Sequence, residues 1–228
     1  MTGDAATVAV IHTSPFTLDP LKDLLTELVP GVTVVNFLDD SILPQLARNG
    51  GDVSAVRDRL LDYARHAQGV GANVILSACS SVGEVATAMR EVVEVPVVRI
   101  DEGMADAAIG RGPRIGVAAT LRTTLAPTLA LLRAKAAAAG VDAKFDARVA
   151  DEAYALLSRG DREGHDRELG AVLEGLAADN DVVVLAQASM ARVLGALPEA
   201  DRAKFLTSPR LAAERVALVL EGSRAERG

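Results

Sequence analysis

Short runs of β-branched and aliphatic residues recur along the chain, and a longer stretch with helical periodicity separates each run from the next. Such continuous apolar runs are typical of strands that are buried on both faces of a parallel sheet. The runs predict strands at residues 7–11, 32–35, 73–76, 95–98, 114–118, 143–147 and 181–185. The intervening periodicity predicts helices at residues 18–28, 54–68, about 81–92, 121–139, 151–158, 163–177, about 190–197 and 211–220. The sequence therefore predicts an α/β fold.

The pattern of alternating runs restarts after residues 99–112, which indicates two similar halves. The passage VILSACSS at residues 74–81 resembles VVLAQASM at residues 183–190, and each passage follows an apolar run and opens a helical stretch. We expect each half to hold a mainly parallel four-stranded sheet flanked by helices.

Charge and composition exclude several classes of partner. Lys and Arg number 24 against 31 Asp and Glu, the net charge is −7, and aromatic residues are only 3% of the chain. Nucleic-acid binding needs basic patches and often stacking aromatics, so we expect none. Without a polybasic stretch, a signal peptide or an apolar run of about 18 residues, we expect no membrane association and a cytoplasmic location. The single cysteine, Cys79, excludes an internal disulfide and a multi-cysteine zinc site.

Candidate site residues follow the predicted strands, because ligands of open parallel sheets bind beyond the carboxyl ends of the strands. They are small hydroxyls, an amide, a carboxylate, an imidazole and a thiol: His12, Ser14, Asp39, Cys79, Ser80, Ser81, Thr120, Gln187 and Ser189. The free N–H groups at helix starts attract anions, whereas cations are scarce at the strand ends, apart from Arg99 and Arg122. The set favours a small carboxylate or imide-like ligand over a nucleotide, and no glycine-rich phosphate loop is present.

Each candidate has a second, structural interpretation. A helix start would lower the pKa of the Cys79 thiol, although most free cysteines are small buried hydrophobes. His12 is a candidate acid/base or ligand-orienting group, or a hydrogen-bonded loop histidine. Asp39 either contacts substrate or, with the neighbouring Asp40 and Ser41, caps a helix. We expect His66 and His165 at the surface.

The chain resembles the aspartate/glutamate/hydantoin racemase superfamily over nearly its whole length. The motifs that carry the resemblance are ILSACSS at 75–81, IGVAAT at 115–120, VVLAQASM at 183–190 and TSP at 207–209. The resemblance implies a first half of residues 1–98 plus 208–228, a second half of residues 99–207, and an active site at their interface. It also implies a homodimer, a small-molecule substrate, and chemistry without an organic cofactor or a metal.

Racemases of this family use two cysteines, one from each half, as proton acceptor and proton donor. Cys79 matches the first. By the family motif the second position is Gln187, whereas the internal repeat would place it at Ala188, and neither is a thiol. The resemblance therefore implies an isomerase or racemase that acts on an amino acid, hydantoin or dicarboxylate, with Cys79 as thiolate base or nucleophile. His12 is the candidate acid/base partner, and Gln187 orients substrate. A single-cysteine lyase such as a decarboxylase and a non-catalytic ligand-binding protein are the alternatives.

Overall fold

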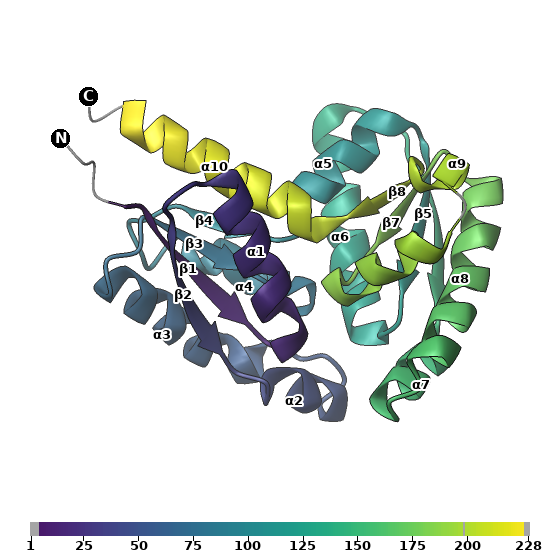
Figure 1. Cartoon of the computed structure of the whole chain (residues 1–228), viewed down its shortest axis with the longest axis horizontal. Coiled ribbons are helices and arrows are strands. Elements are labelled where there is room, and N and C mark those ends of the chain that lie inside the picture. The colour runs from purple at the N-terminus through teal and green to yellow at the C-terminus, as the bar shows by residue number, and fades with distance from the viewer. Residues whose placement is uncertain (1–4, 198, 226–228) are drawn as a thin grey trace. The chain divides into compact units, whose positions relative to one another are not determined.

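Every strand pair in the described part of the chain is parallel, and the strands form two sheets with the same order. The computed structural model describes residues 5–197 and 199–225. These fall into two compact units, one with residues up to Ile100 and from Pro209 onward, the other with Asp101–Ser208. In each unit helices cover both faces of a four-stranded sheet, which confirms the predicted α/β class (Figure 1).

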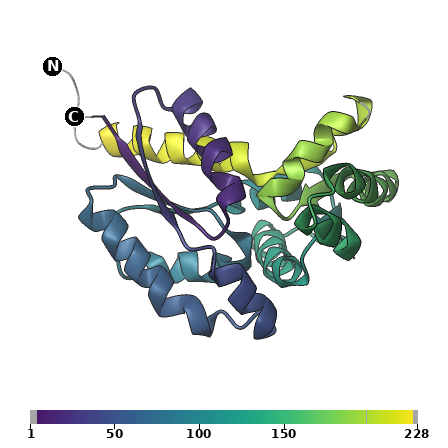
Figure 2. The same ribbon diagram turned by 60° about the horizontal axis from the view of Figure 1, so that its bottom comes forward.

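The first unit has the sheet order β2-β1-β3-β4. Its strands are β1 (Thr7–His12), β2 (Thr33–Leu38), β3 (Val74–Ser77) and β4 (Val97–Arg99). Its helices are η1 (Pro15–Thr17), α1 (Leu18–Leu28), α2 (Ile42–Arg48), α3 (Ser54–Gly69), η2 (Ser80–Val82), α4 (Gly83–Met89) and α10 (Ser208–Ala225), where η marks a 3₁₀ helix. Figure 2 shows α1 and α3 on opposite faces of this sheet.

The second unit has the equivalent order β6-β5-β7-β8. Its strands are β5 (Arg114–Ala119), β6 (Lys144–Val149), β7 (Val182–Leu185) and β8 (Phe205–Thr207). Its helices are α5 (Glu102–Arg111), α6 (Arg122–Ala139), α7 (Asp151–Ser158), α8 (Arg162–Asp179), η3 (Ala188–Ala196) and α9 (Glu199–Arg202).

The two central strand pairs have matching registers. Ile11 of β1 lies opposite Ser77 of β3, and the N–H of Ala78 donates to the Ile11 carbonyl at 2.9 Å. Likewise Ala118 of β5 lies opposite Leu185 of β7, and the N–H of Ala186 donates to the Ala118 carbonyl at 2.9 Å. The residues that follow these strands therefore occupy equivalent places in the two units.

Apolar burial explains why the central strands were predicted most easily. All four residues of β3 and all four of β7 are buried, as a strand covered on both faces requires. The edge strands β2 and β6 have no fully buried residue.

Several elements differ from the sequence-based expectation. Helices α2 and α5 and strand β8 were not predicted. Helix α5 occupies a stretch that was expected to be a connection between the two halves. The helix was not predicted because Gly103 and Gly110 interrupt its pattern of apolar residues. The stretch expected as an α-helix near residue 190 is instead the 3₁₀ helix η3. Ser54 is the first residue of α3 rather than its cap, and the carboxylate of Asp52 accepts its N–H at 2.9 Å.

Candidate active site

Cys79 lies two residues beyond the end of β3 and immediately before η2. Its backbone is extended, with φ −144° and ψ 116°, so the chain turns from strand into helix at this residue. The thiol packs in the apolar cluster of the first unit and is 9% exposed. Ser77, Ser80 and Ser81 around it are buried too.

Three residues donate hydrogen bonds to the Cys79 sulfur: Thr13 through its hydroxyl, Ser81 through its N–H and hydroxyl, and Val82 through its N–H. Burial raises the pKa of the Cys79 thiol, and these donors lower it only in part. The expected lowering of this pKa is therefore wrong, because the loss of water contact outweighs the helix-start N–H groups. The thiolate, once formed, nevertheless meets a prearranged set of donors.

Thr13 reaches Cys79 because of the register between β1 and β3. Ile11 is paired with Ser77, so the second residue after each lies at the same level beyond the sheet edge. Thr13 is buried, with 3% of its surface exposed. It was not among the candidate residues, although its place after the first strand was a usable signal.

His12, the last residue of β1, is fully buried and has both ring nitrogens in hydrogen bonds. Nδ1 lies 2.7 Å from Thr17 Oγ1, and Nε2 lies 3.0 Å from Asn36 Oδ1. Burial lowers the pKa of His12, and the hydrogen bond with Asn36 raises it in part. Burial thus favours the neutral ring, and proton transfer through it requires one of these bonds to break. Its acid/base role stays a prediction.

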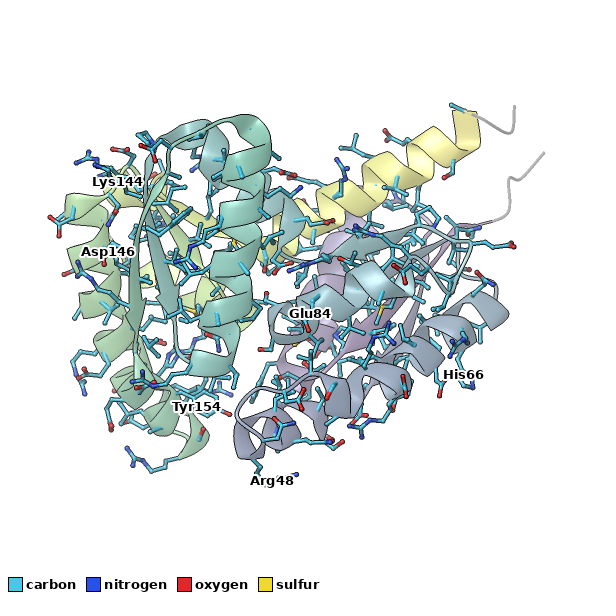
Figure 3. All side chains as sticks on the ribbon, turned by 180° about the vertical axis from the view of Figure 1, so that it is seen from behind. Arg48, His66, Glu84, Lys144, Asp146 and Tyr154 are labelled. Carbon is cyan, nitrogen blue, oxygen red and sulfur yellow. The ribbon has the colours of Figure 1, made fainter. Side chains whose placement is uncertain are left out.

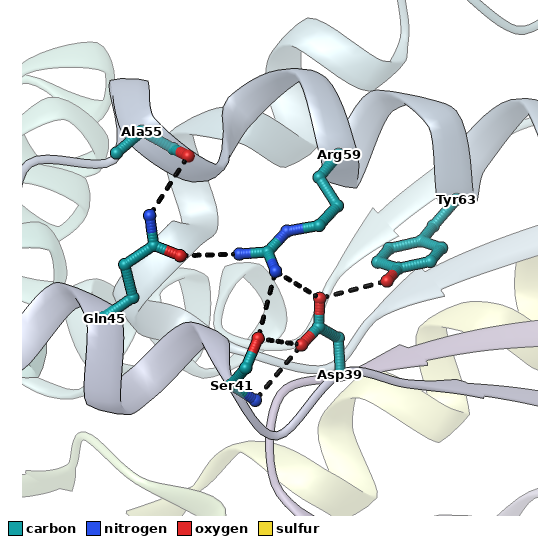
Figure 4. Close-up of polar contacts among 6 residues, drawn as sticks. All are labelled: Asp39, Ser41, Gln45, Ala55, Arg59 and Tyr63. Atoms are coloured by element: carbon teal, nitrogen blue, oxygen red, sulfur yellow. Dashed lines mark hydrogen bonds and ion pairs between the residues drawn. The ribbon is translucent and has the colours of Figure 1, made fainter.

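Asp39 is held in a polar cluster between the β2–α2 connection and α3 (Figure 4). Its Oδ1 accepts from the N–H and hydroxyl of Ser41, at 3.1 and 2.5 Å. Its Oδ2 accepts from the Tyr63 hydroxyl at 3.0 Å and pairs with Arg59 at 3.2 Å. Both oxygens are thus committed within the protein, which favours a structural role for Asp39 over substrate contact. Ser41 does not cap α2 with its side chain.

The remaining first-unit candidates lie on the same sheet edge. Ser14 caps η1, and its hydroxyl accepts the N–H of Phe16 at 3.4 Å. Arg99, at the end of β4, is 8% exposed, and its guanidinium packs against Gly83 at the start of α4. A Cβ on that glycine would lie 2.6 Å from the Arg99 Cζ, so a larger residue there would force the guanidinium to move.

In the second unit, Gln187 takes the place that Cys79 takes in the first. It lies two residues after β7 and immediately before η3, with φ −124° and ψ 136°. Its Oε1 accepts from Thr120 N at 2.6 Å and from Thr120 Oγ1 at 3.2 Å. Within this chain the structural counterpart of Cys79 is therefore Gln187, one residue before the Ala188 that the internal sequence repeat indicated. The side chain of Ser189 lies outside the described part of the structure.

The other two histidines lie apart from these strand ends. His66 is exposed on α3, as expected (Figure 3). His165 is 1% exposed, which contradicts the expected surface position. Its Nδ1 lies 2.7 Å from Asp166, which also pairs with Arg192 of η3. This polar cluster links α8 to η3 and allows the imidazole to be buried.

Among residues 5–197 and 199–225, no group of three or more His, Cys, Asp or Glu side chains is arranged to hold a metal ion. In the same residues, no helix combines the length and apolar character needed to cross a bilayer.

Comparison with solved structures shows which fold the chain shares. Glutamate racemase isoform RacE1 from Bacillus anthracis matches with a TM-score of 0.76 and 16% identity, over 96% of this chain and 82% of that one. An aspartate racemase from Picrophilus torridus matches with a TM-score of 0.72 and 13% identity, over 96% and 95% of the two chains. Allantoin racemase from Klebsiella pneumoniae matches with a TM-score of 0.67 and 19% identity, over 96% and 89%.

Comparison of sequences shows which family the chain belongs to. No curated protein sequence matches the chain. The family model of Asp/Glu/hydantoin racemases, however, matches residues 11–216, which include every described element from the end of β1 to the middle of α10. This match confirms the resemblance that the sequence motifs indicated. The chain belongs to the Asp/Glu/hydantoin racemase family.

Proposed function

We propose that the protein is a cofactor-independent racemase or isomerase that acts on a small carboxylate-bearing or ureide substrate through Cys79. The observation that carries this proposal is the Cys79 sulfur at the carboxyl end of β3, with hydrogen-bond donors from Thr13, Ser81 and Val82. The names of the solved neighbours, glutamate, aspartate and allantoin racemases, support the substrate class.

The surroundings of Cys79 suit a ligand that carries or develops negative charge. Ser14, Ser80 and Ser81 are the proposed substrate-binding hydroxyls of the first unit. In the second unit the proposed substrate-binding residues are Thr120, after β5, and Ser189, in η3. Hydroxyls and helix-start N–H groups stabilise a carboxylate, and they also stabilise the enediolate that forms when an α-proton leaves. The ordered donors cost no reorganisation during the reaction, which is where such a site gains most of its effect.

Cys79 supplies the reactive group. As a base, its thiolate takes the α-proton of the substrate, which leaves a thiol and a carbanion delocalised into the neighbouring carbonyl. The Cys79 thiol can return this proton to the same face, which retains the configuration. A proton from water on the opposite face inverts it, and the hydroxide left behind takes the proton from the Cys79 thiol. Burial lowers the fraction of thiolate at neutral pH, but a thiolate of higher pKa is a stronger base toward a weak carbon acid. As a nucleophile, the same thiolate adds to an activated alkene and is later expelled.

His12 is better suited to hold the β1–α1 connection than to transfer protons. Its two hydrogen bonds, to Thr17 of η1 and to Asn36 of β2, fix the segment that carries Thr13. We propose that it positions Thr13 toward Cys79. A His12→Gln variant that retains activity and the wild-type pH profile supports this role, whereas complete loss of proton exchange in a folded variant supports acid/base chemistry.

The experiment that tests the function is proton NMR in D₂O with a panel of amino acids, hydantoins, substituted malonates and maleate. Each compound is incubated with the wild-type protein and with the Cys79→Ala variant. Loss of an α-proton signal that depends on Cys79 supports carbon-acid chemistry and names the substrate class. Turnover that persists in Cys79→Ala overturns the role of the thiol.

A second candidate function rests on Gln187, because a primary amide has no useful proton chemistry near neutral pH. With one thiol in the whole chain, a lyase or a cis–trans isomerase that needs a single cysteine remains in competition with racemisation. New product signals, such as fumarate from maleate, select this alternative. If no compound changes, a ligand-binding protein without catalysis replaces both.

A further inference from the structure

Two equivalent residue pairs stand at the sheet edges of the two units. Thr13 follows β1 and donates to Cys79, which follows β3. Thr120 follows β5 and donates to Gln187, which follows β7. The matching registers of the strands place each threonine two residues beyond the residue paired across the sheet. The fold thus uses one local arrangement twice, with a thiol in one copy and an amide in the other.

The contacts of Thr120 determine which way the Gln187 amide points. A backbone N–H can only donate, so the Gln187 atom 2.6 Å from Thr120 N is the oxygen Oε1. The Thr120 hydroxyl lies 3.2 Å from the same oxygen. Thr120 is 4% exposed, so this anchor is almost wholly out of water. The amide nitrogen Nε2 must then occupy the opposite branch of the side chain.

The two N–H groups on Nε2 are available for a ligand. Among the backbone groups and side chains that the structure describes, which do not include the Ser189 side chain, no acceptor is in hydrogen-bond contact with Nε2, although the Gln187 side chain is only partly exposed. An amide whose oxygen is fixed and whose nitrogen has no protein partner is an oriented hydrogen-bond donor. It cannot exchange the two ends without losing the Thr120 contacts.

We infer that Gln187 donates a hydrogen bond from Nε2 to a carboxylate or carbonyl oxygen of a small ligand, and so determines specificity for an oxygen acceptor. This inference rests on the proposed function, since it assumes the carboxylate-bearing or ureide ligand. Gln187 then contributes a binding contact in the second unit, whereas the related residue of the first unit is the thiol Cys79.

The discriminating substitution is Gln187→Glu, which preserves the side-chain shape and the acceptor for Thr120 but replaces the outward donor by a carboxylate oxygen. The matched control is Gln68→Glu on α3, because the Gln68 Oε1 also accepts a backbone N–H, that of Glu94 at 2.6 Å. Both variants add the same charge to the protein. Succinate and malonate are the probes, and isothermal titration calorimetry gives their affinities.

We expect Gln187→Glu to weaken binding of both probes by about thirtyfold or more, as loss of a charge-assisted hydrogen bond and addition of a like charge predict. Gln68→Glu should stay within about twofold of the wild type, because screened charges at a distance act weakly. Equal affinities for the wild type and a folded Gln187→Glu variant overturn the inference and leave the proposed function intact. If the wild type binds neither succinate nor malonate, the inference fails for dicarboxylates, and the same pair of titrations with hydantoin decides it for ureides.

A measurement on the wild-type protein covers the case in which Gln187→Glu does not fold. The side-chain amide of Gln187 is assigned in a ¹⁵N-resolved NMR spectrum by its absence from a Gln187→Met variant or by its contacts with Thr120. Its two proton resonances should move when a bound probe accepts a hydrogen bond from Nε2. Resonances that stay in place while a probe saturates the protein overturn the inference.

Discussion

The Asp39 cluster allows the stabilising effect of one hydrogen bond to be measured. Asp39 is 10% exposed at its side chain, and Tyr63 donates to its Oδ2 at 3.0 Å. A hydrogen bond to a charged, nearly buried acceptor is worth about 1.5 to 3 kcal/mol, so Tyr63→Phe should lower the free energy of unfolding by about 1.5 kcal/mol. Asp39→Ala removes all four contacts of the carboxylate and should cost about 3 kcal/mol. Arg59 adds little to this sum, because its side chain is 38% exposed.

Urea unfolding of the two single variants and the double variant gives the interaction energy between Asp39 and Tyr63. We expect a coupling of about 1 kcal/mol or more, because the two groups share one partly buried hydrogen bond to a charged acceptor. The matched control is the exposed pair of Asp62 and Arg65, 2.7 Å apart but with 60% and 53% of the side chains exposed. Its coupling should be about 0 to 0.5 kcal/mol. A coupling for Asp39 and Tyr63 no larger than that of the control refutes the reasoning.

The same cluster predicts a pH dependence with a definite sign. Burial raises the pKa of Asp39, but the hydrogen bonds from Ser41 and Tyr63 and the charge of Arg59 outweigh burial and lower the pKa below its ordinary value. A lowered pKa in the folded state stabilises the protein above the unfolded carboxyl pKa of about 3.9, and this stabilisation is lost as the pH falls through the folded pKa. The difference between wild type and Asp39→Ala should therefore be constant from pH 5 to 7 and shrink as the pH falls below the unfolded carboxyl pKa of about 3.9.

Three further outcomes are expected. The rate at which iodoacetamide alkylates Cys79 should rise with pH through and beyond about pH 9, because burial raises the pKa of the thiol. Thr13→Val removes one donor to the sulfur and should shift this pH profile to higher pH, and an unchanged profile contradicts the role of Thr13. Gly83→Ala should destabilise the protein by about 1 to 3 kcal/mol in urea unfolding, because the new methyl group overlaps the buried guanidinium packed there, whereas Gly110→Ala, with open space around it, should be neutral or stabilising. Gln187→Cys introduces a second thiol at the position equivalent to Cys79. NMR and chiral chromatography in D₂O should then show more inverted product per exchanged α-proton than the wild type gives, and an unchanged ratio of inversion to exchange contradicts this prediction.

Apolar patterning predicted the class of fold and most of the strands, because central strands buried on both faces leave a clear sequence signal. The signal fails where an element is short or its helical face is broken by glycine, as in β8 and α5. Packing against the rest of their unit stabilises these elements. The pattern of apolar residues within a short segment does not show this packing.

The candidate site was predictable to the extent that it depends on strand ends. Cys79 and Gln187 occupy the equivalent positions that the family motif indicated. Thr13 was missed because its contact with Cys79 follows from the register of β1 and β3, which a linear sequence does not state. The raised pKa of Cys79 was missed for a related reason, since the depth of burial depends on the complete packing around the thiol. The buried position of His165 depends in the same way on Asp166 and the segment that packs over it.

The path of the chain between its two units has a consequence for synthesis on the ribosome. The chain leaves the first unit after Ile100 and re-enters it at Pro209, so the second unit is a continuous insertion in the first. Helix α10, whose Arg210 pairs with Glu27 of α1 at 2.9 Å, is the last part of the first unit to be translated. The nascent second unit can acquire its complete sheet while the first still lacks a helix. Vectorial folding should therefore finish the inserted unit before the unit that contains the cysteine.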